Sequence, residues 1–130
     1  MKLEPDKLIS SEIFSEVLTG IGNDIVKTII EPWSKAWIQV EMRENDNGVV
    51  NGFYKSKKTF KVIYIDLPES TFDSFRKLRM YFEINGYTPW TCLTFSMDAD
   101  GSFETDYSYE SLDGTDEIKR RIDWEKINLK

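Results

Sequence analysis

Eight carboxylate side chains lie between positions 98 and 117, a window that contains no lysine or arginine. Carboxylates gathered in this way can perform acid–base catalysis, hold a cation or bind a basic partner. The whole chain has 23 acidic and 17 basic residues, so the 15 acidic residues outside the window are outnumbered by the bases. The net charge of −6 therefore originates in this acidic window, which consists of Asp98, Asp100, Glu104, Asp106, Glu110, Asp113, Asp116 and Glu117.

Catalysis and metal binding find little support in the rest of the sequence. The chain has no histidine, which excludes His-assisted nucleophilic triads, His-ligated zinc and imidazole acid–base chemistry. An EF-hand calcium loop needs glycine at its sixth position and glutamate at its twelfth. Counted from Asp98, these positions hold Phe103 and Tyr109. We therefore expect a protein that is not an enzyme and has no catalytic residue, metal site or cofactor.

The acidic window has the pattern of an ordered hairpin. Phe103, Tyr107 and Tyr109 alternate with polar residues, which predicts a strand rather than a disordered acidic tail. The sequence Asp98–Gly101 predicts the turn that joins this strand to a preceding one over residues 90–97. One face of the hairpin is then apolar, and the other is polar and negative, with Cys92, Thr94, Ser96, Asp98, Glu104, Asp106, Ser108 and Glu110.

The remaining elements must position this hairpin. Apolar residues from Ile9 to Ile29 recur at helical spacing, and Gly20 and Gly22 predict a kink or two short helices there. A second helix is expected to begin at Ser70 and end before Asn85–Gly86, and a third covers residues 115–127. The expected strands cover residues 33–44, 52–55, 60–65, 90–97 and 103–109. This order predicts a single α+β domain over residues 1–130, with a mostly antiparallel sheet of about five strands and helices packed on one face.

Trp37 has two interpretations. Alternation places it on the sheet face opposite Ala36, Ile38 and Val40. If that face is open, Trp37 is a candidate interface anchor, because tryptophan is over-represented among binding hot spots. If a helix covers the face, Trp37 is an ordinary core residue.

Composition restricts the location and the partners. Hydrophobic residues make up 40% of the chain, which argues against disorder, yet no stretch approaches the roughly 20 apolar residues of a membrane helix. The segment Met1–Asp6 lacks the apolar core of a signal peptide. The single Cys92 fits a reducing compartment, and a pI near 4.7 argues against direct binding to nucleic acid. We therefore expect a cytoplasmic protein that binds neither membranes nor nucleic acid directly.

A series of landmarks runs in order from about residue 30 to the end of the chain. They are Trp37, Phe53–Tyr54, Asn85–Gly86–Tyr87, Pro89–Trp90, the turn Asp100–Phe103, the strand Asp106–Glu110, and Arg120 to Trp124. This order resembles that of the YezG-like immunity protein family, although Lys119-Arg120-Arg121 replaces the Glu-Arg that members often carry before the final tryptophan. The resemblance implies a small acidic antitoxin that neutralises a polymorphic toxin, typically a nuclease delivered between competing bacteria.

The predicted partner is therefore the C-terminal domain of a cognate toxin, most simply a basic nuclease. An acidic face would imitate the nucleic acid substrate and attract the basic cleft. The predicted toxin-binding residues are Glu104, Asp106, Glu110, Asp113, Asp116, Glu117 and Trp37. Two alternatives are a generic protein-interaction module without a toxin partner and a carboxylate-dependent hydrolase. The sequence leaves open RNase or DNase activity of the toxin, active-site or exosite binding, oligomeric state and stoichiometry.

Overall fold

The computed structural model describes residues 11–44 and 47–129. Its elements in chain order are α2 (Ser11–Thr28), β1 (Trp33–Met42), β2 (Gly48–Ser56), β3 (Val62–Ile65), α3 (Glu69–Ile84), β4 (Cys92–Asp98), β5 (Phe103–Ser108) and α4 (Glu117–Asn128). The strands form one antiparallel sheet in the order β3-β2-β1-β4-β5. The prediction of an α+β fold with a five-stranded antiparallel sheet is confirmed. Within the described ranges, no helix has the length and apolar character needed to span a bilayer.

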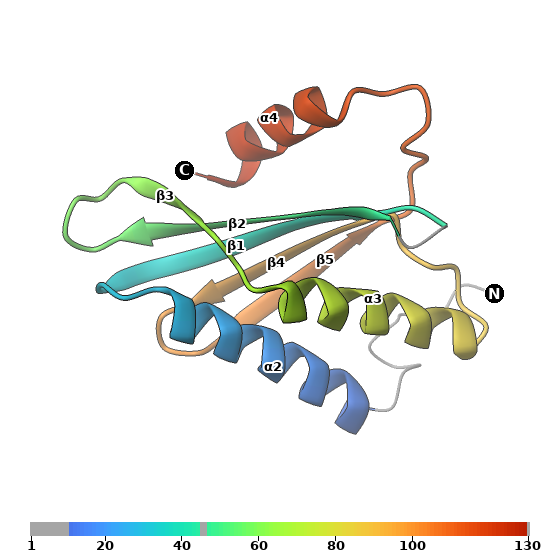
Figure 1. Ribbon diagram of the computed structural model, residues 1–130, viewed down its shortest axis with the longest axis horizontal. Coiled ribbons are helices and arrows are strands. Elements are labelled where there is room, and N and C mark those ends of the chain that lie inside the picture. Colours follow the sequence, from blue (N-terminus) through green and yellow to red (C-terminus); the bar gives the residue numbers. More distant parts are fainter. Residues whose placement is uncertain (1–10, 45–46, 130) are drawn as a thin grey trace.

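Helices α2 and α3 pack side by side against one face of the sheet (Figure 1). The core lies between these two helices and the sheet, and its central side chains are completely buried. They include Ile21 and Ile25 of α2, Ile38 of β1, Phe75 of α3 and Phe95 of β4. Period-two alternation in the strands and helical periodicity in α2 and α3 direct these side chains toward the core.

Helix α4 lies over the opposite face of the sheet (Figure 1). The prediction that the helices pack on one face is therefore correct for α2 and α3 but wrong for α4. Helix α4 lies entirely within the described residues, and none of its side chains is buried. Its isoleucines at positions 118, 122 and 127 are exposed, so α4 does not dock through a hydrophobic stripe as an amphipathic core helix does.

Helix α2 is a single element of 18 residues, so the predicted kink or break at Gly20 and Gly22 is absent. A Cβ atom added at Gly22 would lie 3.3 Å from the sulfur of Met97, whereas one at Gly20 would meet nothing within 4 Å. Gly22 thus allows α2 to approach β4 closely. Ile9, where the predicted helical pattern begins, lies outside the described residues, as do residues 45 and 46 between β1 and β2.

The predicted division of the last hairpin into two faces is confirmed. The register pairs Thr94 with Asp106 and Ser96 with Glu104, so these side chains share the face that lies away from α2 and α3. On the other face, the apolar side chains of β4 are buried. Phe103 belongs to the predicted apolar face, which should be buried, but its side chain is 40% exposed. The reason is its place on β5, which forms one edge of the sheet.

Candidate functional site

The outer face of the sheet, opposite α2 and α3, is divided by α4. Trp124 of α4 donates a hydrogen bond from Nε1 to Thr94 Oγ1 at 2.8 Å, and its ring centroid lies 5.6 Å from that of Phe53 on β2. Arg120 donates to both carboxylate oxygens of Glu41 on β1, at 2.8 and 2.9 Å. These contacts hold α4 over β1, β2 and β4. They leave β5 at the rim of the face.

Trp37 lies in the covered part of this face and is only 4% exposed. Its cross-strand neighbour on β2 is Phe53, which contacts Trp124 of α4. Lys35 places its Nζ 5.7 Å from the centroid of the Trp37 ring. The open face required for an interface anchor is therefore absent at this position. Of the two interpretations of Trp37, the structure agrees with the covered core residue.

Three predicted residues form what we call the acidic rim, namely Glu104, Asp106 and Glu110. All three are exposed. Their carboxylates form no hydrogen bond or ion pair with any residue that the structure describes. The cross-strand neighbours of the first two are Ser96 and Thr94, which carry no charge. Because no cation among the described residues pairs with these carboxylates, their charges add to a negative potential outside the sheet.

The other predicted acids have contacts within the protein or lie apart from the rim. Asp113 accepts an ion-paired hydrogen bond from Arg43 Nη1 at 3.2 Å. Asp116 caps α4 by accepting a hydrogen bond from the backbone N–H of Ile118 at 3.1 Å. Glu117 is exposed in the first turn of the same helix, where a negative charge is favourable. The structure therefore gives Asp113 an exposed ion pair and Asp116 a helix-capping role, neither of which the sequence analysis assigned.

The turn between β4 and β5 explains a further part of the acidic window. Asp100 accepts hydrogen bonds from the Ser102 hydroxyl at 2.7 Å and from the Ser102 backbone N–H at 2.9 Å. These two bonds hold the pKa of Asp100 below its ordinary value. Asp98 also accepts from the Ser102 hydroxyl, at 3.4 Å. The sequence Asp98–Ser102 is thus a hydrogen-bonded hairpin turn, as its turn chemistry predicted.

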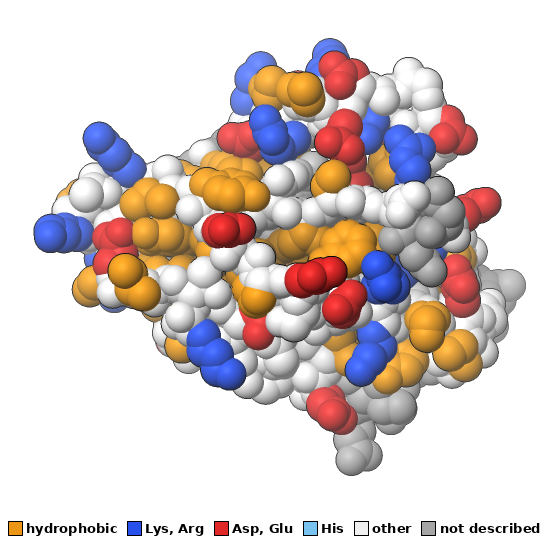
Figure 2. All heavy atoms as spheres, viewed as in Figure 1, with side chains coloured by type: hydrophobic (Ala, Val, Ile, Leu, Met, Phe, Trp, Pro, Cys, Tyr) orange, Lys and Arg blue, Asp and Glu red, His pale blue; other side chains and the backbone are white. Residues whose placement is uncertain are grey.

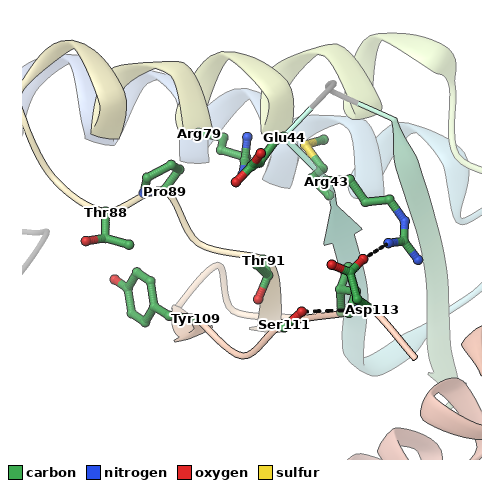
Figure 3. A pocket seen from close by; sticks show the side chains of 11 residues that line it. Arg43, Glu44, Arg79, Thr88, Pro89, Thr91, Tyr109, Ser111 and Asp113 are labelled. Carbon is green, nitrogen blue, oxygen red and sulfur yellow. Dashed lines mark hydrogen bonds and ion pairs between the residues drawn. The ribbon is translucent and has the colours of Figure 1, made fainter. Parts of the chain in front are cut away.

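A cleft of about 570 Å³ opens beside the C-terminal end of β1, where Arg43 and Glu44 follow the strand (Figure 3). It is lined by residues of α3, β1 and the loops that flank β4 and β5, including Arg43, Arg79 and Tyr109. Asp113 is the one member of the acidic window among the lining residues, and it is paired with Arg43. A smaller hollow of about 160 Å³ holds Asp98, Glu104 and Lys35, but substrate pockets usually exceed about 300 Å³. Neither site combines two window carboxylates with the space that a hydrolase substrate needs.

Other chemically reactive groups are few. Burial raises the pKa of the Cys92 thiol, and the nearby carboxylate of Glu41 raises it further. A thiol in this environment is a poor nucleophile. Among the described residues, no three His, Cys, Asp or Glu side chains gather closely enough to hold a metal ion.

Positively charged side chains cluster near β3, the edge strand opposite β5. Lys57, Lys58 and Lys61 are exposed around the turn from β2 to β3, and Figure 2 shows basic side chains projecting at this end of the molecule, on the left. Strand β3 forms one edge of the sheet and β5 the other. The two edges therefore differ in charge, so they present different surfaces to a charged partner.

Comparison with known proteins identifies a family and a relative that this chain resembles. The model of a family described as "Immunity protein YezG-like" matches residues 61–130. The protein named "Immunity protein YezG" from Bacillus spizizenii is 31% identical over 106 aligned residues. That alignment covers 71% of this chain and 66% of the relative, slightly less than two thirds of the relative's length. The family match spans β3 to α4, so it includes both the acidic rim and the helix over the outer face.

Proposed function

This chain belongs to the YezG-like immunity protein family, and from this premise we propose that it binds and neutralises a cognate bacterial toxin in the cytoplasm. The toxin is a basic nuclease domain, and the chain inhibits it without catalysing a reaction itself. The observation that carries this proposal is the acidic rim, in which Glu104, Asp106 and Glu110 have no cationic partner among the described residues.

The negative charge of the acidic rim is the reason for proposing a nuclease as the partner. Nuclease domains bind polyanions, so their active clefts carry lysine and arginine. The backbone that bears Glu104 and Asp106 is already ordered in a strand. These carboxylates can therefore present negative charge to such a cleft without a further large loss of backbone entropy. Attraction between the two surfaces speeds their encounter, which an inhibitor of a free toxin requires.

The rim also carries a cost that a partner would relieve. Glu104 and Asp106 lie two positions apart on the same face of β5, so their like charges repel each other. Lysine or arginine side chains of a bound partner would neutralise them. A generic interaction module would share this property, so binding to a toxin is what separates the two functions.

The test is titration calorimetry of the full chain against the C-terminal domain of the large protein encoded immediately upstream, at two salt concentrations. We expect a dissociation constant of about 1 nM or lower, weakening as salt rises. A parallel assay should show that the chain stops the domain from degrading RNA or DNA. Absence of binding to a folded domain would refute the proposal and favour the generic module. Tight binding that is insensitive to salt would retain the immunity function but refute the acidic rim as its basis.

A further inference from the structure

We propose that β5 receives an extended segment of the toxin as an added strand, and that this segment alternates basic and apolar side chains. This inference rests on the proposed function and specifies how the partner docks. Strand addition supplies affinity through backbone hydrogen bonds and specificity through alternate side chains. Three features of β5 support it: an edge that pairs with no other described strand, its charge, and the side chain of Phe103, which is 40% exposed.

The first feature is the backbone of β5. In the described part of the chain, β5 pairs with β4 on one side, and no strand lies on its other side. Asp98 N–H donates to Ser102 C=O at 2.8 Å, which makes these two residues a hydrogen-bonded pair of the β4–β5 ladder. Such pairs alternate along antiparallel strands. Glu104 and Asp106 therefore direct their backbone groups toward β4, whereas Phe103 and Thr105 direct theirs outward.

The second feature is the charge on this edge. Natural sheets commonly protect their edges with lysine, proline or very short strands. The other edge strand, β3, has four residues and lies beside three lysines, whereas β5 has six residues and contains neither lysine nor proline. Glu104 and Asp106 would repel an acidic strand, including a second copy of β5, and would attract a basic one. The charge of this edge thus restricts the class of partners that could pair with it.

The third feature is on the core face of the same strand. Phe103 is 40% exposed and stacks on Phe95, with ring centroids 5.5 Å apart. A strand added beside β5 would place alternate side chains next to Phe103 and cover its open side. The intervening side chains would lie on the outer face beside Glu104 and Asp106. Apolar residues suit the first set of positions and lysine or arginine the second, which gives the proposed alternation.

The decisive experiment is residue-resolved hydrogen exchange on the wild-type chain, free and bound to the upstream-encoded toxin domain. We expect the amide protons of Phe103 and Thr105 to exchange at least about tenfold more slowly in the complex. Those of Glu104 and Asp106, which already bond to β4, should change much less. Unchanged exchange at Phe103 and Thr105 in a complex that does form would overturn strand addition alone. Failure to form any complex would overturn the proposed function as well.

A pair of variants provides a second test. Thr105→Pro removes an outward N–H but no hydrogen bond to β4, and edge strands tolerate proline at such positions. Thr105→Ala is the matched control, because it shortens the same side chain and keeps the N–H. We expect Thr105→Pro to weaken toxin binding at least about tenfold relative to Thr105→Ala. Equal affinities for two folded variants would overturn the inference. If circular dichroism shows that the proline variant is unfolded, the wild-type exchange experiment decides.

Discussion

Arg120 of α4 and Glu41 of β1 form a two-bond ion pair across the outer face of the sheet. Nε and Nη2 of the guanidinium lie 2.8 and 2.9 Å from the two carboxylate oxygens, and the Glu41 side chain is only 4% exposed. Hydrogen bonding to Glu41 raises the pKa of Arg120, so the guanidinium stays charged. Because α4 buries none of its own side chains, this pair and Trp124 are its principal attachments to the sheet.

Arg120→Met should detach α4 before the rest of the domain unfolds. While α4 still covers Glu41, removing Arg120 leaves the buried charge of Glu41 uncompensated, at a cost of about 3 kcal/mol. Release of α4 relieves this cost, because water then reaches Glu41. Hydrogen exchange of the α4 amides and urea unfolding measure this loss. The matched control is Arg121→Met, which breaks an exposed pair with Glu125 on the same helix and should cost about 0.5 kcal/mol or less. Equal losses in the two variants would show that the Arg120 pair does not hold α4.

Gly20→Ala should stabilise the protein by about 0.5–1 kcal/mol, because alanine has less freedom than glycine in the unfolded chain and the site is open. Gly22→Ala should gain less, because its new methyl group would lie 3.3 Å from the sulfur of Met97. Thermal or urea unfolding of both variants measures the difference. A gain at position 22 equal to that at position 20 would contradict the close approach of α2 to β4.

Glu31 should contribute to loss of stability in acid. It accepts hydrogen bonds from the hydroxyls of Tyr54, at 2.7 Å, and Ser56, at 2.5 Å, and these bonds, the Ser56 bond first, lower the pKa of Glu31. A carboxyl group whose folded pKa lies below its unfolded value, near 4.5, stabilises the fold above that value. It loses this contribution as the pH falls through the folded pKa.

Urea unfolding from pH 7 to about pH 3 should therefore show a smaller acid-induced loss for Glu31→Gln than for the wild type. Glu16→Gln is the control, since Glu16 is exposed on α2. Parallel pH profiles for the wild type and Glu31→Gln would contradict the role of these hydrogen bonds.

Reversing two charges of the acidic rim should slow toxin association. For Glu104→Lys with Asp106→Lys, we expect the association rate constant at low salt to fall about tenfold or more, with a weaker dependence on salt. Stopped-flow fluorescence with the toxin domain measures both quantities. Glu16→Lys with Asp66→Lys changes the net charge equally at exposed sites elsewhere. If both double variants associate at the same rate, net charge and not the rim governs encounter.

Much of the fold follows from local sequence patterns. Alternation identified both faces of β4 and β5, and the helical spacing of apolar residues located α2 and α3. The docking of α4 was missed, since its contacts join Arg120 to Glu41 and Trp124 to Thr94, far apart in the chain. A signal was present, because residues four apart lie on the same side of a helix. Arg120 and Trp124 share such a side, which could have indicated a polar and aromatic docking surface.

The sequence by itself determined the charge of the acidic window, the absence of histidine, the faces of the strands and the resemblance to an immunity protein family. The tertiary structure decided that Trp37 is covered, that Asp113 and Asp116 have partners within the protein, and that Glu104 and Asp106 lie on an edge strand. The physical reason is the separation along the chain over which each property is set. Side-chain direction follows from local backbone geometry. Burial and ion pairing depend on which distant segments meet, and the periodicity of a single strand or helix does not specify those contacts.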